Sequence, residues 1–313
     1  MVNGGGALAR AEEILRAACG SRLRTGFALA PLTTFRIGGP AALYLEPGSL
    51  PDLQAAGRAV RETGIPFVVI GKGSNVLVAD EGFPGLVLRL GKPFRWAARD
   101  GERLTAGGAM PLPALSGVAL SHSLAGLEFG VAIPASLGGA VRMNAGAHDR
   151  SLDEVIEEVE VFSLDEGRTT FVPAEQAGFR YRGSDLPGKG VVIGATVRLQ
   201  HGERDGIRAL MDEAREWRRR TQPLAEPNCG SVFKNPPNDH AARLIEAAGA
   251  KTLSVGGAAV SSKHANFIVA QEGAHAADVL ALIQRIQEQV ADRFGVRLEP
   301  EVHLVGNVEP AIS

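Results

Sequence analysis

Hydrophobic residues along the chain follow two spacings, which predict alternating helices and short strands. Apolar residues recur at helical spacing over 7–18, which indicates an amphipathic helix near the start of the chain. Short apolar runs at 42–46 and 67–70 are typical of strands. A turn-rich segment at 31–40 precedes the first of these runs.

The segment between the two runs carries the start and stop signals of a helix over 50–63. Ser49 is a favourable N-cap, Asp52 stands three residues further on as in a capping box, and Gly64 ends the helix. Strand, helix and strand together predict a βαβ unit, with a ligand position after the second strand.

Residues 86–199 predict mainly strands joined by tight turns. A hairpin turn is expected at Asp100-Gly101, another turn at 165–167, and one helix at 113–121. The expected strands are 86–90, 94–98, 102–105, 159–164, 168–172 and 191–199.

From about Glu203 the pattern becomes helical again and indicates a separate α+β domain. Helices at 241–248 and 276–294 flank a predicted strand at 266–270. A long helix is expected after Glu203, and one face of it is marked by Ile207, Leu210, Met211, Ala214 and Trp217. Alternation in a last strand over 296–304 would place on one face Arg297, Glu299, Glu301 and His303.

The segment 71–75, Gly-Lys-Gly-Ser-Asn, is a glycine-rich turn directly after a predicted strand. Glycine reaches positive φ readily, so successive N–H groups in such a turn can converge on an anion, most often a phosphate. The turn is not a P-loop, because Lys72 is followed by Gly73. It is not the dinucleotide fingerprint either, because Val76 occupies the place of the third glycine and starts a strand-like run. The alternative is an ordinary polar hairpin turn.

A second stretch of small residues, 129–148, is nearly uncharged and rich in glycine. Small side chains would let a flat ligand lie against the backbone, and the alternative is a tightly packed helix crossing. Four arginines near the end of the long helix either complement its negative end or bind an anion. They are Arg215, Arg218, Arg219 and Arg220.

Composition places the chain among ordinary soluble globular proteins, with 313 residues, 45% hydrophobic and 22% charged. A net charge of -2 and an aromatic content of 5% argue against nucleic acid or an anionic membrane as the main partner. Cys19 and Cys229 lie far apart, so we expect a reducing cytoplasm rather than a disulfide scaffold. No signal peptide and no membrane-spanning run of about 20 residues is expected.

Ser231 and Lys234 have the Ser-x-x-Lys spacing of acyl-serine enzymes. The elements that accompany this spacing are missing, since Lys251-Thr252 is followed by Leu253 rather than glycine. The seven histidines show no spacing typical of metal ligands. Taken alone, Ser231 therefore reads as a structural serine in a turn.

Seven motifs follow one another in a specific order over nearly the whole chain past Gly26. They are Thr34–Gly39, Gly71–Asn75, Ile133–Ala140, Asn144–Ala147, Phe179–Ser184, Gly230–Pro236 and Leu298–Val302. In this order the motifs resemble the UDP-N-acetylenolpyruvoylglucosamine reductase family, flavoenzymes of bacterial cell-wall precursor synthesis.

The resemblance implies an α+β fold class. It combines a two-subdomain FAD-binding fold of the vanillyl-alcohol/p-cresol flavoenzyme type with a C-terminal α+β substrate domain. The expected parts are an N-terminal tail and helix at 1–25, FAD-binding subdomains at 26–85 and 86–202, a substrate-binding domain at 203–306 and a tail at 307–313. A cytoplasmic monomer without nucleic-acid or membrane partners is expected.

The resemblance also implies the chemistry. FAD, bound noncovalently, would take electrons from NADPH and pass a hydride to the terminal carbon of the enolpyruvyl double bond of UDP-N-acetylglucosamine enolpyruvate. Arg182, Ser231 and Glu301 match the family's catalytic positions. Arg182 would stabilise the enolate charge, and Ser231 would donate the final proton with help from Lys234. A protonated Glu301 could donate to the enolate, although Glu301 could instead belong to a solvated row of charges.

Binding residues follow from the same resemblance. The pyrophosphate of FAD would lie at Gly71, Lys72, Gly73, Ser74 and Asn75, and the flavin along Ser136, Gly139, Asn144, Ala145 and Gly146. Candidates for holding the substrate diphosphate are Arg218, Lys234, Asn235 and His264. No metal is expected.

The chain departs from the family pattern at two places. Ala135 stands where the family often has glycine, and a positive φ there would cost an alanine about 1 kcal/mol. Residues 185–190 are too short for the tyrosine-bearing loop of one branch, so the chain resembles the other branch. Two other hypotheses are an alcohol-oxidising flavoenzyme of the same fold and a nonenzymatic nucleotide-binding module.

Overall fold

The computed structural model describes residues 4–308, which form two compact units. Unit 1 contains the described part of 1–25 together with 43–72 and 85–217. Unit 2 contains 26–42, 73–84 and the described part of 218–313. The predicted boundaries between three domains stay a prediction, and most of the predicted tail at 307–313 lies outside the described residues.

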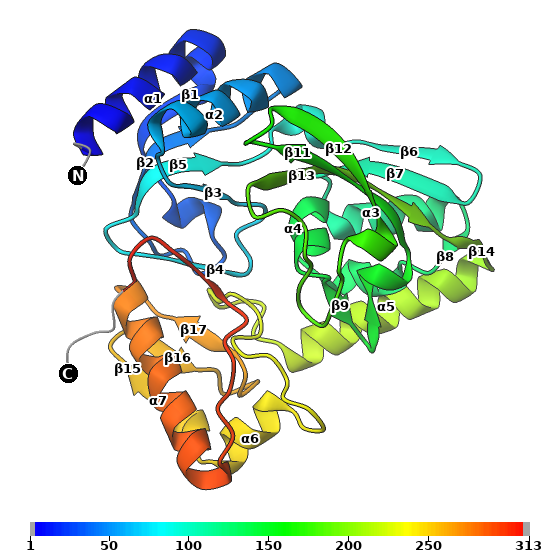
Figure 1. Ribbon diagram of the computed structural model, residues 1–313. Helices are drawn as coiled ribbons and strands as arrows, with labels where there is room; N and C mark the ends of the chain where they lie inside the picture. Colours follow the sequence, from blue (N-terminus) through cyan, green and yellow to red (C-terminus); the bar gives the residue numbers. More distant parts are fainter. Residues whose placement is uncertain (1–3, 309–313) are drawn as a thin grey trace. The chain divides into compact units, whose positions relative to one another are not determined.

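The helices α1 (Gly4–Cys19) and α2 (Leu50–Thr63) lie beside a four-stranded sheet, with which they share a hydrophobic core (Figure 1). The strands in order across the sheet are β1 (Leu23–Ala28), β2 (Pro40–Leu45), β5 (Phe83–Leu88) and β3 (Phe67–Val69). β3 pairs in parallel with β5. The predicted βαβ unit is therefore present, with β5 between its two strands.

Both ends of α2 agree with the sequence signals. The Ser49 Oγ accepts a hydrogen bond from the Asp52 N–H at 3.4 Å, and Gly64 closes the helix in the left-handed region at φ 68°. The Asp52 carboxylate accepts from the Gly48 N–H at 2.8 Å and from Arg22 at 2.7 Å. In a capping box the Asp52 carboxylate would accept from the N–H of Ser49. Here it accepts from the N–H of Gly48, one residue earlier.

Unit 1 also contains a five-stranded antiparallel sheet. Its strands in order are β12 (Arg168–Pro173), β11 (Ile156–Ser163), β13 (Gly190–Arg198), β7 (Arg103–Gly107) and β6 (Ala97–Asp100). The helices α3 (Leu112–Ser121) and α4 (Leu137–Arg142) contribute to the same core as this sheet. The predicted turn at Asp100-Gly101 joins β6 to β7, with Gly101 at φ 60°.

The long helix α5 (Arg204–Thr221) buries a narrower face than its apolar residues suggest. On the predicted apolar face, Ile207, Met211 and Ala214 are buried in a small cluster. Leu210 and Trp217, which belong to the same predicted face, are 55% and 39% exposed. The cluster is too small to cover the whole apolar stripe.

Unit 2 has its core between two helices and two small sheets. The helices are α6 (Ala241–Ala247) and α7 (Ala276–Phe294). One sheet contains β15 (Ser254–Val255), β16 (Ala258–Val260) and β17 (Ile268–Ala270), and the other pairs β4 (Val76–Val78) in parallel with β18 (His303–Val305). The Asp80 carboxylate, just after β4, accepts hydrogen bonds from the N–H groups of Ala276 and Ala277 and so caps α7.

The predicted last strand over 296–304 is only partly correct, because β18 begins at His303. Ahead of β18 a single antiparallel bridge joins Pro300 to Phe233. Two backbone hydrogen bonds flank this bridge, from the Lys234 N–H to the Glu299 carbonyl and from the Glu301 N–H to the Val232 carbonyl, and the segment pairs with β4 only from His303 onward. Glu299 is exposed and Glu301 is partly buried, so these two carboxylates do not share one environment.

The remaining elements are short. The strands are β8 (Leu124–Ala125), β9 (Gly146–Ala147), β10 (Arg150–Ser151) and β14 (Gln200–His201). The 3-10 turns are Gly20–Arg22, Ala30–Leu32, Lys92–Phe94, Glu128–Ala132, Leu152–Glu154, Ala174–Gln176 and Ala250–Thr252.

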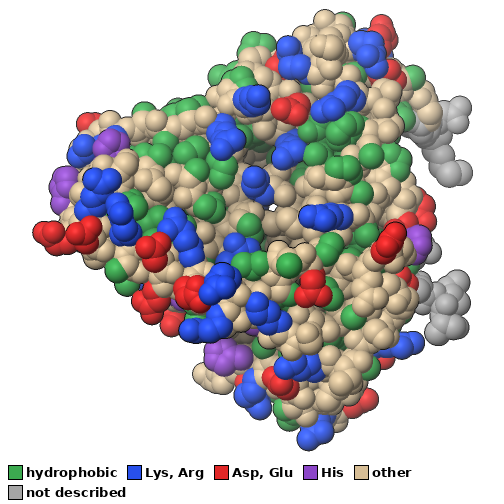
Figure 2. All heavy atoms as spheres, turned by 180° about the vertical axis from the view of Figure 1, so that it is seen from behind, with side chains coloured by type: hydrophobic (Ala, Val, Ile, Leu, Met, Phe, Trp, Pro, Cys, Tyr) green, Lys and Arg blue, Asp and Glu red, His purple; other side chains and the backbone are tan. Residues whose placement is uncertain are grey.

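The surface mixes charges of both signs with apolar side chains, as Figure 2 shows for one face. Within residues 4–308, no helix combines the length and apolar character needed to cross a membrane.

Gly39 gives a test of the close packing in unit 2. A Cβ at this position would lie 2.1 Å from the Asp80 carbonyl oxygen and 2.5 Å from the Gly82 nitrogen, and both are backbone atoms. We expect Gly39→Ala to lower the free energy of unfolding by roughly 3 kcal/mol in urea titrations. The matched control is Gly117→Ala in α3, where nothing lies within 4 Å, and this change should raise stability by up to about 1 kcal/mol. Equal effects of the two substitutions would contradict this account of the backbone contact.

Candidate active site

The turn 71–75 offers a run of backbone donors. Within residues 4–308 its five N–H groups have no hydrogen-bond acceptor in the protein. Gly73 adopts φ 64°, and a Cβ there would lie 2.0 Å from the Leu32 carbonyl oxygen, so only glycine fits. The strand β4 follows the turn, as predicted. Unpaired amides in consecutive residues are what an anion-binding nest requires.

The chain passes from unit 1 to unit 2 between Lys72 and Gly73. On the unit 1 side, a Cβ on Gly71 would lie 2.2 Å from the Ser136 Oγ, so this glycine and serine are in close contact. Ser136 is buried and caps α4 by accepting from the Gly139 N–H at 3.4 Å. The predicted residues Gly71 and Ser136 therefore lie together in unit 1.

The N–H groups at the start of α4 are not available to an anion. Leu137 donates to the Met110 carbonyl at 2.7 Å, and Gly138 donates to the Gly108 carbonyl at 2.9 Å. Ala135 does not adopt a positive φ, so the strain expected from alanine at this position is not present. This stretch offers packing surface rather than free backbone donors.

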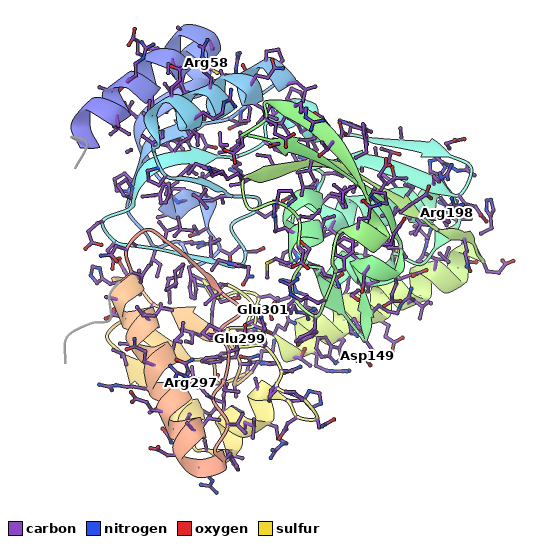
Figure 3. The ribbon with its side chains drawn as sticks, viewed as in Figure 1. Arg58, Asp149, Arg198, Arg297, Glu299 and Glu301 are labelled. Atoms are coloured by element: carbon purple, nitrogen blue, oxygen red, sulfur yellow. The ribbon has the colours of Figure 1, made fainter. Side chains whose placement is uncertain are left out.

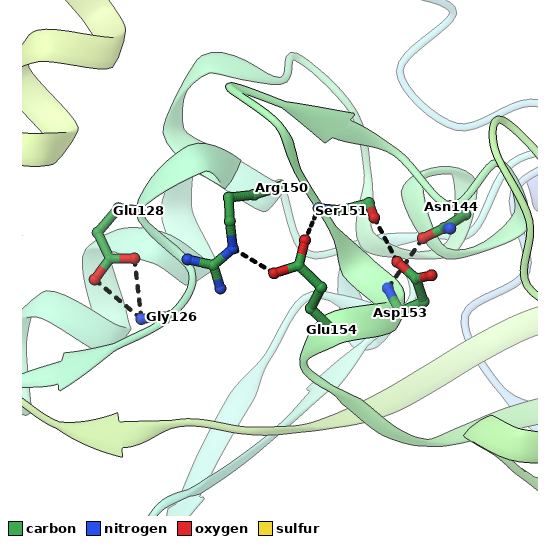
Figure 4. A network of polar contacts seen from close by, with 7 residues as sticks. All are labelled: Gly126, Glu128, Asn144, Arg150, Ser151, Asp153 and Glu154. Carbon is green, nitrogen blue, oxygen red and sulfur yellow. Dashed lines mark hydrogen bonds and ion pairs between the residues drawn. The ribbon is translucent and has the colours of Figure 1, made fainter. Parts of the chain in front are cut away.

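Asn144 is the buried centre of the second glycine-rich stretch, with 2% of its surface exposed. Its Nδ2 donates to the Arg180 carbonyl at 3.2 Å, and its Oδ1 accepts from the Asp153 N–H at 3.0 Å. Figure 4 shows this contact and the neighbouring polar network of the segment 150–154. Asn144 therefore fixes two loops around Ala145 and Gly146, with its own φ at 41°.

Arg182 lies in a tight turn of unit 1, closed by reciprocal backbone hydrogen bonds between Arg180 and Gly183. Its φ of 55° is in the left-handed region, which costs a non-glycine residue energy and is often found at functional sites. The guanidinium donates to the Gly146 carbonyl at 3.1 Å and lies 4.9 Å from the centre of the Tyr181 ring. The structure thus brings a predicted catalytic residue into contact with a predicted flavin-binding residue.

The segment around Ser231 in unit 2 is held by one buried asparagine. Asn266 accepts from the Phe233 N–H at 2.9 Å and donates to the Phe233 carbonyl at 2.8 Å, while its own carbonyl accepts from the Val232 N–H at 2.9 Å. Ser231 itself is partly buried. Within the described residues its hydroxyl makes no hydrogen bond, so it remains open to a ligand.

The segment of Glu301 runs antiparallel to the segment of Ser231. The Glu301 N–H donates to the Val232 carbonyl at 2.7 Å, and the Lys234 N–H donates to the Glu299 carbonyl at 2.9 Å. The Lys234 ammonium pairs with the Glu299 carboxylate at 2.6 Å, so its charge is already matched by an exposed acid. Figure 3 labels Glu299 and Glu301 along this segment. Two predicted catalytic segments therefore lie side by side in unit 2.

The predicted substrate-binding residues have structural partners. The Arg218 Nε donates to Gln222 at 3.0 Å, and burial lowers the pKa of this guanidinium. The Asn235 Oδ1 accepts from the Ala241 N–H at 3.0 Å, at the start of α6. The His264 Nδ1 accepts from the Asn266 N–H at 3.2 Å. Burial, together with the charge of Lys251, lowers the pKa of His264 and favours the neutral ring.

Cys229 is buried next to this site and is not a reactive thiol. Burial raises its pKa, and the nearby Glu301 charge adds to the effect. Between residues 4 and 308, no cluster of three or more His, Cys, Asp or Glu side chains could hold a metal ion.

Sequence reasoning missed Asn266 and Asp80. Asn266 was placed at the start of a predicted strand, and its only sequence signal is a polar residue beside apolar neighbours. Asp80 follows β4 and caps a helix that begins 196 residues later. Nothing in the local pattern reveals such a distant partner.

Comparison with known proteins identifies the family. A family model for the C-terminal domain of UDP-N-acetylenolpyruvoylglucosamine reductase matches residues 222–305, and a model for an FAD-binding domain matches residues 41–172. The reductase of Heliobacterium modesticaldum is 47% identical over 277 residues, which is 88% of each chain. The chain belongs to the UDP-N-acetylenolpyruvoylglucosamine reductase family.

Structural similarity agrees with this family. The crystal structure of the reductase from Thermus caldophilus superposes with a TM-score of 0.77 at 37% identity, covering 90% of this chain and 97% of that chain. A glucose dehydrogenase, Phl p 4.0202, reaches a TM-score of 0.50 at 13% identity over 92% of this chain and 63% of its own, which shows the fold alone. The predicted fold class is confirmed. The chain combines an FAD-binding fold of the vanillyl-alcohol/p-cresol flavoenzyme type with the C-terminal domain of the reductase family.

The buried Asn266 gives a test of how the Ser231 segment is held. Asn266→Ala would leave both backbone groups of Phe233 without partners in a buried place. We expect it to lower the free energy of unfolding by roughly 2–4 kcal/mol. Gln271→Ala, at an exposed amide one residue after β17, should change stability by less than about 0.5 kcal/mol. Urea unfolding measures both, and a mild Asn266→Ala variant would show that the segment is held by other contacts.

Proposed function

We propose that this protein uses NADPH to reduce UDP-N-acetylglucosamine enolpyruvate to UDP-N-acetylmuramate through noncovalently bound FAD. The observation that carries the proposal is the 47% identity to a reductase of this name over 88% of the chain. The proposed role is in the cytoplasm, as a monomer, in peptidoglycan precursor synthesis and hence in cell shape and division. NADPH oxidation that depends on the enolpyruvyl UDP-sugar tests the activity. Consumption of an alcohol and oxygen instead would support a different flavoenzyme of the same fold.

The described residues fit FAD. The five amides of turn 71–75 would receive the pyrophosphate, because they have no acceptor within the described protein and can converge on an anion. The small residues from Ser136 to Gly146 would line the flavin. FAD bound in this way would supply the hydride that the substrate's double bond accepts.

Arg182 would stabilise the charge that hydride addition creates. The substrate gains a hydride at the terminal carbon, and the electron pair of the double bond moves to the carbon beside the carboxylate. A preorganised donor at such a charge is worth about 10²–10³ in rate. The Arg182 guanidinium suits a carboxylate, because its fork of N–H groups can bind both oxygens. Its bond to Gly146 and the strained turn hold it in place before the substrate arrives.

Ser231 would give its hydroxyl proton to the carbanion and complete the reduction. The substrate then has gained one hydride and one proton, and NADPH has become NADP⁺. The open Ser231 hydroxyl supports this role. Glu301, whose backbone bonds to the same segment, is the second candidate donor to the enolate. The Lys234 ammonium would stabilise the alkoxide that Ser231 becomes when it gives up its proton. The ion pair with Glu299 limits this stabilisation, because it already compensates the ammonium charge.

The substrate diphosphate would be held by cations and donors of unit 2. Arg218, Lys234, Asn235 and His264 are the proposed residues. Asn235 lies at the start of α6, where its Oδ1 accepts from the Ala241 N–H. His264 would act as a neutral donor through Nε2, because its Nδ1 accepts from Asn266.

The turn assignment can be tested with Ser74→Asp. A carboxylate among amides that bind phosphate would repel the pyrophosphate by roughly 1–4 kcal/mol at effective dielectrics between those of water and a protein surface. We expect FAD affinity, measured by fluorescence titration of the apoprotein, to fall about tenfold or more. Ser254→Asp, which adds the same charge at an exposed position in β15, should bind FAD normally. Full flavin occupancy in Ser74→Asp would exclude the turn as the pyrophosphate site.

Ser231→Ala tests the proton donor. Flavin reduction by NADPH should remain almost intact, because the hydroxyl acts after the hydride moves. Reoxidation by the enolpyruvyl substrate should slow about 10²–10⁴-fold, as for a lost general acid. Substrate affinity should change little. Stopped-flow absorbance near 450 nm separates the two half-reactions.

Cys229→Ala, two residues away, is the matched control and should leave both half-reactions nearly unchanged, because the buried thiol is protonated. Equal slowing of both half-reactions in Ser231→Ala would indicate a structural or flavin-binding role. An unslowed second half-reaction would assign the proton to another donor, with Glu301 next.

A further inference from the structure

Glu301 is held through its backbone from two sides within unit 2. Its N–H donates to the Val232 carbonyl at 2.7 Å, next to Ser231. Its carbonyl accepts from the side-chain amide of Asn75 at 3.1 Å. The N–H of Glu301 is thus bonded to the residue that follows the proposed proton donor, and its carbonyl to the turn proposed for the pyrophosphate.

Asn75 holds this segment at a second point. Its carbonyl accepts from the His303 N–H at 3.1 Å, where β18 starts to pair with β4. Side chain and main chain of one residue therefore bind two positions only two residues apart. Such a pair of bonds fixes both the position and the rotation of the backbone that carries Glu301. A single bond would leave the segment free to turn about it.

We propose that Asn75 is a positioning residue that links occupancy of the turn 71–75 to the placement of Glu301. This inference rests on the proposed function. The main-chain N–H of Asn75 belongs to the turn whose amides have no acceptor within the described residues, while its side chain serves Glu301. An anion that orders the turn also orders the Asn75 side chain. By reciprocity, a well-placed Glu301 segment favours anion binding by the same factor.

A contact of the same chemistry elsewhere in the segment provides the matched control. The Gln287 side chain of α7 donates to the Leu298 carbonyl at 2.8 Å, three residues before Glu301. Both bonds join a side-chain amide to a backbone carbonyl of the same segment. Only the bond of Asn75 starts from the turn. A purely structural role would therefore make Asn75→Ala and Gln287→Ala behave alike.

The experiment compares wild type, Asn75→Ala and Gln287→Ala, each saturated with FAD. In Asn75→Ala we expect flavin reduction by NADPH to stay within about threefold of wild type. Reoxidation by the enolpyruvyl UDP-sugar should slow about 10–100-fold at saturating substrate, since a misplaced acid lowers kcat more than it raises KM. Gln287→Ala should keep both half-reactions near wild type.

Hydrogen exchange provides a readout that does not depend on activity. In wild type, FAD binding should slow amide exchange in a peptide covering 299–305. This effect should disappear in Asn75→Ala and persist in Gln287→Ala. Circular dichroism and thermal unfolding check that each variant is folded. If Asn75→Ala fails to fold, Asn75→Asp replaces it, because a carboxylate keeps the shape but cannot donate the bond while ionised.

Two results would overturn the inference. One is equal slowing of both half-reactions in the Asn75 variant, or loss of flavin affinity with normal reoxidation of the loaded protein, which would leave Asn75 a cofactor ligand only. The other is exchange in 299–305 that does not respond to FAD in wild type. Failure of the proposed function looks different, because wild type itself would then not be reoxidised by the enolpyruvyl UDP-sugar.

Discussion

Unit 2 depends on the hydrogen bonds of one extended segment, residues 299–305. Its first half bonds to the segment 232–234, and its second half forms β18 beside β4. Without these bonds, nothing in the segment would fix the relative positions of Ser231, Glu301 and the end of the glycine-rich turn. The backbone groups of three distant segments are satisfied by one another, and unpaired groups in such a place would cost roughly 1–3 kcal/mol each.

Local features of the fold could be predicted from the sequence. α7 begins at Ala276 and ends at Phe294, as predicted, because its apolar spacing and Gly295 define it. Ser49 and Gly64 likewise predicted the two caps of α2. The length of β18 was not, because the alternation over 296–304 does not show that residues 299–301 bond to the segment 232–234 while only 303–305 pair with β4. The exposure of Leu210 and Trp217 could not be predicted from the helix sequence, because it depends on which other parts of the chain pack against α5.

The candidate site, too, has a part that the sequence predicts and a part that it does not. Motifs pointed to the turn 71–75 and to Arg182, Ser231 and Glu301 as residues of interest. Their surroundings could not be predicted, because each depends on a residue far away in the chain. The ion pair between Lys234 and Glu299 joins residues that are 65 positions apart in the sequence. The hydrogen bond from the Phe233 N–H to Asn266 joins residues that are 33 positions apart. The backbone strain at Arg182 is also a property of the folded turn, since arginine alone gives no sign of a positive φ.

The parallel pair of β4 and β18 has a consequence for synthesis of the protein in the cell. Asn75 leaves the ribosome 226 residues before its partner Glu301. At roughly 5–20 residues per second, that separation corresponds to about 10–45 s of translation. During this time the apolar edge Val76–Val78 has no strand to pair with, and open strand edges are sites of wrong association. Within the described residues this edge is covered by β18, so its protection waits until residues 303–305 have been made.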